Sequence, residues 1–186
     1  MVASDSVVLL DDEGRAIGSA TKDEVHGTDT PLHLAFSCYL FDASGRVLLT
    51  RRSLHKRSWP GVWTNSFCGH PAPEEAMEDA IARHAYSELG VTVDQPRLIL
   101  ADFRYRATDA SGVVENEVCP VYFANTSDAV AANPAEVSEF AWVAPQDLAR
   151  TVASVPQLLS PWSVLQVPRI LEHLTHRPQG TAGAGA

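Results

Sequence analysis

Short apolar runs recur along the chain between polar or glycine-rich segments, which is the pattern of β-strands joined by turns. We expect strands at residues 7–10, 35–41, 46–50, 98–104, 113–124 and 139–143. The segment Asp42-Ala-Ser-Gly45 lies between the second and third of these and predicts a hairpin. Pro120 falls within the fifth and indicates an edge strand or a bulge, because proline cannot donate a hydrogen bond to a neighbouring strand.

A helical period dominates the middle of the chain, where apolar residues recur every three to four positions. The spacing of Met77, Ile81 and Ala85 predicts a helix over 74–89. Residues typical of helix ends flank this segment, namely Pro73, Glu74 and Glu75 at its start and Gly90 at its end.

Other segments are assigned by the same patterns. Polar residues 21–33 and Pro- and Gly-rich residues 53–73 predict loops, the second of them long and ordered. Two more helices are expected at 145–152 and 162–174, the latter interrupted at Pro168.

The chain of 186 residues suits one domain, which we place at residues 1–176. Helices interspersed among hairpin-type strands predict an α+β fold in which helices are layered on a mixed sheet. Residues 177–186 are rich in Gly and Ala and are predicted to form a disordered tail.

Charge narrows the classes of partner. The chain has 14 basic and 23 acidic residues, so its net charge is −9. Such a surface repels nucleic acids and anionic membranes, and an anionic ligand needs a local group of cations or a metal ion. We find no membrane-spanning apolar run and no signal peptide, and the three cysteines form no CxxC pair. These features predict a cytoplasmic protein with reduced thiols.

Two carboxylates and three histidines form the first candidate site. Glu115 and Glu117 project to the same side of a predicted strand, with backbone positions about 6.6 Å apart. A solvated face would explain the pair, but the flanking valines favour partial burial, where two carboxylates need a cation or a shared proton. His26, His33 and His70 lie in loop-like segments and would complete a set of nitrogen and oxygen ligands for a divalent ion.

Three further features carry chemistry. Cys68 stands next to a candidate ligand, where it is either a small buried residue or a group that transfers a proton. Arg51, Arg52, Lys56 and Arg57 fall within seven positions, which is an anion site or a solvated basic turn, with Lys22 as a possible addition. Glu88 lies on the apolar face of the predicted helix, so it is paired, bound to a cation or exposed by fraying of the helix end.

The residues around this helix have the spacing of a Nudix box. The box runs Gly, five residues, Glu, seven residues, Arg and then a Glu and a Gly, matched by Gly69, Glu75, Arg83, Glu88 and Gly90. His84 and Ser87 stand where the hydrolases of this family carry carboxylates for the magnesium ion that activates water. Their presence argues against hydrolase chemistry.

Further motifs resemble one branch of the Nudix superfamily, type I isopentenyl-diphosphate delta-isomerase. The matching motifs are Thr30-Pro-Leu-His33, Trp59-Pro-Gly-Val-Trp63-Thr-Asn-Ser, Cys68-Gly-His70-Pro, Phe103-Arg-Tyr105, Val114-Glu-Asn-Glu117 and Ser160-Pro-Trp162. They occur in the right order over most of residues 7–175. The resemblance implies a Nudix-like fold and a metal-dependent isomerase of isoprenoid biosynthesis. Its partner would be a small diphosphate, and the assembly a monomer or a weak homo-oligomer.

The resemblance also implies roles for single residues. The ligands of a Mn²⁺, Mg²⁺ or Zn²⁺ ion would be His26, His33, His70, Glu115 and Glu117. Glu88 would hold a second ion, Mg²⁺ bound to the diphosphate. The catalytic groups would be Cys68, Glu117 and Tyr105. The substrate contacts would be Lys22, Arg52, Lys56, Arg83 and Trp162.

Two other functions compete with the isomerase. One is a Nudix hydrolase acting on a diphosphate, which the residues His84 and Ser87 disfavour. The other is a noncatalytic binding domain stabilised by a metal ion, which would bind diphosphates without turnover.

Overall fold

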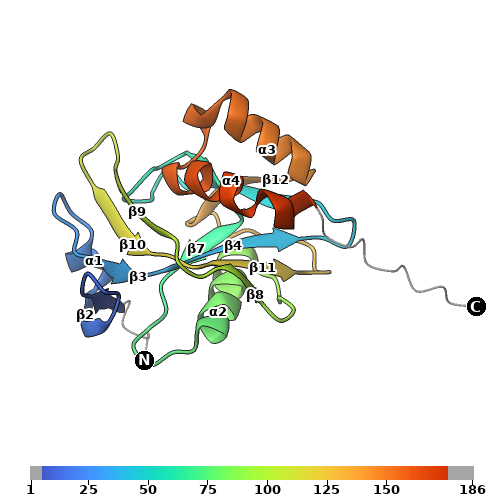
Figure 1. Ribbon diagram of the computed structural model, residues 1–186. Helices are drawn as coiled ribbons and strands as arrows, with labels where there is room; N and C mark the ends of the chain where they lie inside the picture. The colour runs from blue at the N-terminus through green and yellow to red at the C-terminus, as the bar shows by residue number, and fades with distance from the viewer. Residues whose placement is uncertain (1–5, 176–186) are drawn as a thin grey trace, which may run out of the picture.

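The computed structural model describes residues 6–175, which form two mixed sheets and their covering helices (Figure 1). The first sheet has the order β2 (Ala16–Thr21), β1 (Ser6–Leu10), β3 (His33–Leu34), β10 (Val114–Val118) and β9 (Arg104–Thr108). Strands β3 and β10 are parallel, and the other neighbours are antiparallel. This sheet brings an N-terminal segment beside residues more than eighty positions later in the chain.

The second sheet has the order β12 (Val137–Val143), β5 (Val47–Arg52), β4 (Phe36–Phe41), β11 (Val121–Asn125) and β8 (Arg97–Leu100). Two short strands extend it: β6 (Trp63–Thr64) pairs with β5, and β7 (Phe67–Gly69) pairs with β4. The predicted hairpin is present, but β4 and β5 pair directly only at Phe41 and Val47. Residues 53–73 therefore supply strands where a loop was expected.

Helices cover both faces of the second sheet (Figure 1). The helices are α1 (Lys22–Val25), α2 (Met77–Leu89), α3 (Pro145–Ser154) and α4 (Pro161–Thr175), with a 3₁₀ turn at Pro156–Leu158. Strand β4 is buried on both sides: Phe36, Cys38 and Leu40 pack toward α2, and Tyr39 and Phe41 pack toward α3 and α4. The predicted α+β layering is confirmed, and burial on both faces explains why β4 is apolar at nearly every position.

The strand predicted at 113–124 is two strands. Of the two alternatives for Pro120, the edge strand was wrong, whereas the pairing of β11 with β8 has a bulge or irregularity directly after it, between Val121 and Tyr122. Pro120 lies between β10 and β11, which are interior strands of different sheets. Proline ends the first ladder where the chain crosses to the second sheet, because it has no N–H to donate. The strand expected at 98–104 is divided in the same way between β8 and β9.

Helix α2 begins at Met77, three residues later than predicted. Glu74 has a φ of 66°, in the left-handed region, so the helix cannot include it. The Glu75 carboxylate accepts the Ala72 N–H at 2.8 Å and thus belongs to the preceding turn. The end at Gly90 is confirmed, with a φ of 66° that glycine adopts without strain.

Helix α4 runs without a break through Pro168, contrary to the predicted interruption. Proline inside a helix costs about 3 kcal/mol locally, but Val167, Ile170 and Leu174 on this helix are buried in the core. Their burial offsets that cost. Three other elements were missed: β2, α1 inside the expected loop at 21–33, and β3, which begins at the last residue of that loop. The predicted tail at 177–186 lies outside the described residues. Within residues 6–175, no helix combines the length and the apolar character needed to cross a bilayer.

Candidate active site

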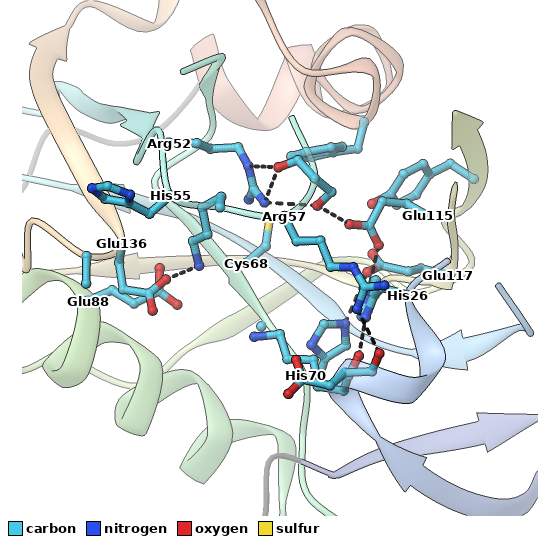
Figure 2. A pocket seen from close by; sticks show the side chains of 18 residues that line it. His26, Arg52, His55, Arg57, Cys68, His70, Glu88, Glu115, Glu117 and Glu136 are labelled. Carbon is cyan, nitrogen blue, oxygen red and sulfur yellow. Dashed lines mark hydrogen bonds and ion pairs between the residues drawn. The ribbon is translucent and has the colours of Figure 1, made fainter. Parts of the chain in front are cut away.

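A cavity of about 270 Å³ collects almost all of the candidate residues (Figure 2). Its walls come from both sheets and from three helices. The predicted residues that line it are Lys22, His26, Arg52, Lys56, Cys68, His70, Glu88, Tyr105, Glu115, Glu117 and Trp162. Cys68 and Glu117, the two groups expected to handle protons, therefore share one cavity.

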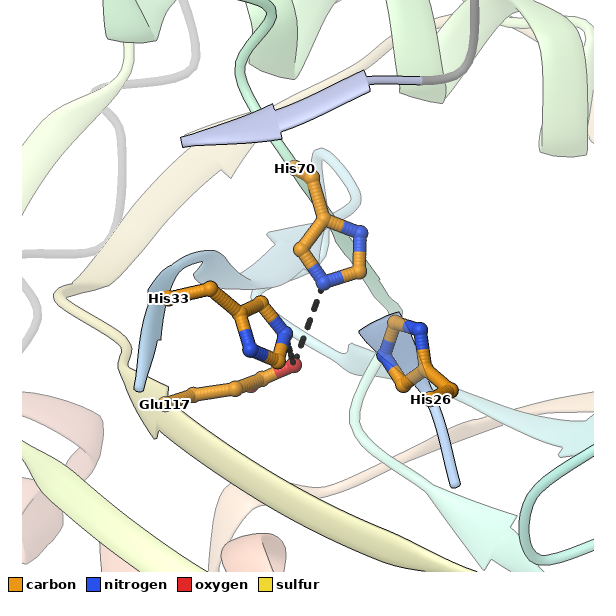
Figure 3. Close-up of side chains that lie close together, drawn as sticks. All are labelled: His26, His33, His70 and Glu117. Carbon is orange, nitrogen blue, oxygen red and sulfur yellow. Dashed lines mark hydrogen bonds and ion pairs between the residues drawn. The ribbon is translucent and has the colours of Figure 1, made fainter. Parts of the chain in front are cut away.

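Three histidines and a glutamate lie together at one side of this cavity (Figure 3). One nitrogen or oxygen atom from each of His26, His33, His70 and Glu117 lies within 4.8 Å of the others. The parallel pairing of β3 with β10 places His33 opposite Glu117. His26 caps α1, and His70 directly follows β7. The structure thus brings these distant segments together, as the sequence predicted, close enough for one ion to contact all four side chains.

The hydrogen bonds of two histidines leave their Nε2 lone pairs free for a cation. The Nδ1 atom of His26 donates to the carbonyl of Lys22 at 3.0 Å, and that of His33 donates to the carbonyl of Pro31 at 2.9 Å. A carbonyl only accepts, so both neutral rings carry their proton on Nδ1. The Nε2 atoms then face carboxylate oxygens, Glu115 at 3.1 Å and Glu117 at 3.5 Å.

Two of these facing atoms, His33 Nε2 and Glu115 Oε2, are buried and have no hydrogen-bond partner among residues 6–175, whereas Glu117 Oε1 also lies 3.2 Å from His70 Nε2. Leaving such groups unpaired is costly, and a cation or a proton placed between them removes the cost. The residues present thus fit a divalent ion with nitrogen and oxygen ligands.

The pKa shifts differ among the residues of the cluster. Burial lowers the pKa of His26, but the Glu115 carboxylate outweighs it and raises the pKa, which favours a proton between these two groups when no ion is bound. Burial lowers the pKa of His70 to about 4, so its imidazole is neutral at pH 7 and has a lone pair to offer. Burial opposes ionisation of Glu117, but the imidazoles of His33 and His70 outweigh it and hold the pKa of that carboxyl well below its usual range. Glu115 and Glu117 are 6% and 5% exposed, so the alternative of a solvated pair was wrong.

Cys68 is held from two sides. Its sulfur lies 3.3 Å from Ser37 Oγ and 3.3 Å from Asn65 Oδ1. Asn65 Nδ2 donates to the carbonyls of Cys38 and Phe67 at 3.0 and 2.8 Å, which fixes its oxygen on the side of the thiol. Burial raises the pKa of Cys68 to about 12, so the resting group is a neutral thiol.

Aromatic rings form another wall. The rings of Tyr105 and Trp162 lie 5.7 Å apart, and Trp59 packs edge-on against Trp162 at 5.5 Å. The indole N–H of Trp162 donates to Asn65 Oδ1 at 2.9 Å. The Arg52 guanidinium lies over the Trp162 ring, 5.5 Å from its centroid, so this ring already faces a positive charge.

Basic and acidic groups face each other across the remaining part of the cavity. Lys56 forms an ion pair with Glu136, and burial lowers the pKa of this lysine to about 8. Glu88 is buried and bonded to His84 Nδ1 at 2.9 Å. Burial opposes its ionisation, but the His84 hydrogen bond outweighs it and lowers the pKa of Glu88. The alternative of a frayed, exposed helix end is therefore wrong.

Two predicted site residues are not part of the described cavity wall: His33, which lies behind it in the histidine cluster, and Arg83. The Arg83 guanidinium donates to both carboxylate oxygens of Glu75, at 2.8 and 2.6 Å, and to the carbonyl of His70 at 3.1 Å. It thus braces the turn before α2. The contact of Arg83 with the diphosphate, which the family resemblance implies, stays a prediction.

The sequence analysis gave no role to Asn65 and Ser58, which contact candidate groups. Asn65 joins Cys68 to Trp162, and Ser58 donates to Glu115 at 2.6 Å. Asn65 stands inside a recognised motif, so its place among matched residues was the available signal. Ser58 had no such signal, because its partner lies 57 positions away.

We expect Gly69→Ala to destabilise the protein. A Cβ atom at this position would lie 2.5 Å from Nε2 of His84, whose ring is held by Glu88 and packs edge-on against Phe36. Overpacking of this kind typically costs about 1–3 kcal/mol of the free energy of unfolding, measured by chemical denaturation. Combining it with His84→Ala should recover most of the loss. Equal destabilisation by the single and double variants would contradict this cause.

Comparisons with known proteins agree with this geometry. The NUDIX domain family matches residues 31–162. Among solved structures, DR0079 from Deinococcus radiodurans superimposes with a TM-score of 0.66 at 21% identity, covering 88% of this chain and 98% of that one. The MutT protein from Methanosarcina mazei Go1 gives 0.64 at 20% identity, covering 78% and 96%. These likenesses establish the Nudix fold.

Closer relatives narrow the family. A protein named isopentenyl-diphosphate delta-isomerase from Clavibacter sepedonicus is 56% identical, over 97% of this chain and 94% of its own. One of the same name from Paenarthrobacter aurescens is 58% identical, over 92% and 94%. The protein therefore belongs to the isopentenyl-diphosphate delta-isomerase family, a branch of the Nudix superfamily.

Proposed function

We propose that the protein is a type I, metal-dependent isomerase that interconverts isopentenyl diphosphate and dimethylallyl diphosphate in isoprenoid biosynthesis. Relatives of this name above 50% identity support it. The observation that carries it is one cavity that contains a thiol, a carboxylate beside three imidazoles, and an aromatic wall. The substrate is the small diphosphate expected from the resemblance.

The reaction adds one proton to an alkene and removes another from the opposite face of the molecule. Cys68 and Glu117 are the proposed acid and base, because each has a proton or a lone pair to exchange and both line the cavity. Tyr105, paired with Glu117 across β9 and β10, positions or relays a proton.

The intermediate is a tertiary carbocation, which water would quench. Trp162 is 3% exposed, and its ring face can stabilise a desolvated cation by about 2 kcal/mol. Exclusion of water from this wall prevents capture of the cation. The buried surroundings of Cys68 serve the same purpose.

Metal ions complete the proposed site. His26, His33, His70, Glu115 and Glu117 would hold Mn²⁺, Mg²⁺ or Zn²⁺, and Glu88 would hold a Mg²⁺ ion bound to the diphosphate. The bound ions would neutralise the diphosphate and set the proton affinity of Glu117. Lys22, Arg52 and Lys56 line the same cavity and would contact the diphosphate oxygens. These contacts would hold the substrate at the end remote from its double bond and so orient the double bond toward Cys68 and Glu117.

The hydrolase alternative has weaker support. His84 is bonded to Glu88 instead of supplying a further carboxylate, and Ser87 donates to the carbonyl of His84 at 3.3 Å. The box thus lacks two of the groups that would bind the water-activating magnesium. A cytoplasmic setting and a monomeric or weakly associating state stay predictions from the sequence.

The test is incubation of the protein with isopentenyl diphosphate and Mg²⁺ in heavy water. We expect dimethylallyl diphosphate carrying deuterium, without release of phosphate, detected by NMR and mass spectrometry. Phosphate release in proportion to enzyme concentration would favour the hydrolase. Tight binding without any exchange would favour a noncatalytic domain.

A further inference from the structure

Ser58 is a buried hydroxyl between an arginine and a glutamate of the cavity. It is 6% exposed. Its Oγ atom lies 2.6 Å from Glu115 Oε1 and 3.2 Å from Arg52 Nη2. The same guanidinium also donates to the Ser58 carbonyl, at 3.1 and 2.9 Å. The residue thus joins two candidate groups that lie on different sheets.

The direction of these hydrogen bonds is determined by their chemistry. A guanidinium has donors and no acceptor, so the Ser58 hydroxyl accepts from Arg52. Its single proton is then available only to Glu115, whose Oε1 receives it. With Oε1 occupied, the other oxygen, Oε2, points to the Nε2 lone pair of His26 at 3.1 Å. That oxygen is buried, and the part of the chain that the structure describes supplies no hydrogen-bond partner for it.

We propose that Ser58 is a positioning residue that orients Glu115 toward the cation bound by the histidine cluster. The inference rests on the metal site of the proposed function and adds to it a residue that the family motifs do not contain. Partners that orient a ligand matter to affinity, because a ligand free to rotate pays an ordering cost on binding. Ser58 removes that freedom before the ion arrives.

The backbone around Ser58 is built to hold this position. Trp59 has a φ of 44°, in the left-handed region that bulky residues avoid. Its N–H donates to Asp109 Oδ2 at 3.2 Å. Asp109 Oδ1 also accepts the N–H of Val113 at 3.0 Å, in the turn that leads into β10, the strand of Glu115. Two hydrogen bonds, from Ser58 and from Trp59, therefore attach this corner to the hairpin that carries the ligand.

The test measures Mn²⁺ affinity by calorimetry, with no substrate present. We expect Ser58→Ala to weaken binding by about 10- to 100-fold, the usual effect of losing such a partner. Ser58→Thr keeps the hydroxyl and should recover most of the affinity. The matched control is Ser53→Ala. Ser53 is also a buried serine, 2% exposed, and among the hydrogen bonds described its hydroxyl only accepts the His55 N–H. This variant should leave the affinity unchanged.

The outcomes separate this inference from the proposed function. A wild-type protein that binds no Mn²⁺ would overturn the metal site itself. Binding by wild type and equal binding by Ser58→Ala would overturn only the role of Ser58. If Ser58→Ala does not fold, Asp109→Ala is the second variant. It removes the carboxylate that accepts the Trp59 N–H, and so detaches the backbone beside Ser58 from the hairpin that carries Glu115. It should weaken Mn²⁺ binding several-fold, and wild-type affinity in this variant would then overturn the proposal.

Discussion

Replacing Cys68 by alanine is expected to lower kcat by about 10⁴-fold, the upper range for loss of a positioned acid or base. The two groups that contact its sulfur, the Ser37 hydroxyl and the Asn65 amide, are weaker acids than the thiol and cannot take its place. The KM should change little, since the proposed diphosphate contacts are elsewhere. Both constants are measured from the appearance of dimethylallyl diphosphate.

Another cysteine supplies the control for this variant. Cys38 is fully buried, does not line the cavity, and packs on the α2 side of β4. Cys38→Ala should lose stability and keep near-normal turnover. Near-normal turnover in Cys68→Ala would remove the proposed acid–base role, and equal losses in both variants would point to a general effect of core packing.

Glu117→Gln is expected to remove both metal binding and turnover. The carboxamide has nearly the same shape, but it carries no charge and places a donor or a weaker acceptor beside His33 and His70. We expect at least a 100-fold loss of Mn²⁺ affinity and a fall in kcat of about 10⁴-fold or more, because one residue serves as ligand and as proton carrier. Metal content after dialysis and initial rates provide the measurements.

The matched change is Glu139→Gln on β12. Glu139 is exposed and pairs with Arg51 at 3.3 Å, away from the cavity wall. This variant should keep metal content and turnover. Full metal occupancy in Glu117→Gln would contradict its role as a ligand, and retained activity would contradict its role in proton transfer.

Local patterns predicted most elements but not how strands are shared between sheets. The period of Met77, Ile81 and Ala85 located α2, because one helix face is buried against β4. Residues 113–124 look like one strand because both halves contain valines and other residues that favour extended structure. Pairing with β3 on one side and β4 on the other divides them at Pro120. That division depends on partners more than seventy positions away, which no local pattern contains.

The sequence by itself determined the family, the charge balance and the types of group available to the site. The motifs and their order assigned roles to Cys68, Glu117 and the three histidines, because the residue types that carry the chemistry can be recognised without knowing the fold. Only the tertiary structure decided that Arg83 braces a turn, that Ser58 meets Glu115, and that Asn65 serves Cys68 and Trp162 together. Such contacts join segments distant in the chain, and side-chain direction at a contact depends on packing from all sides.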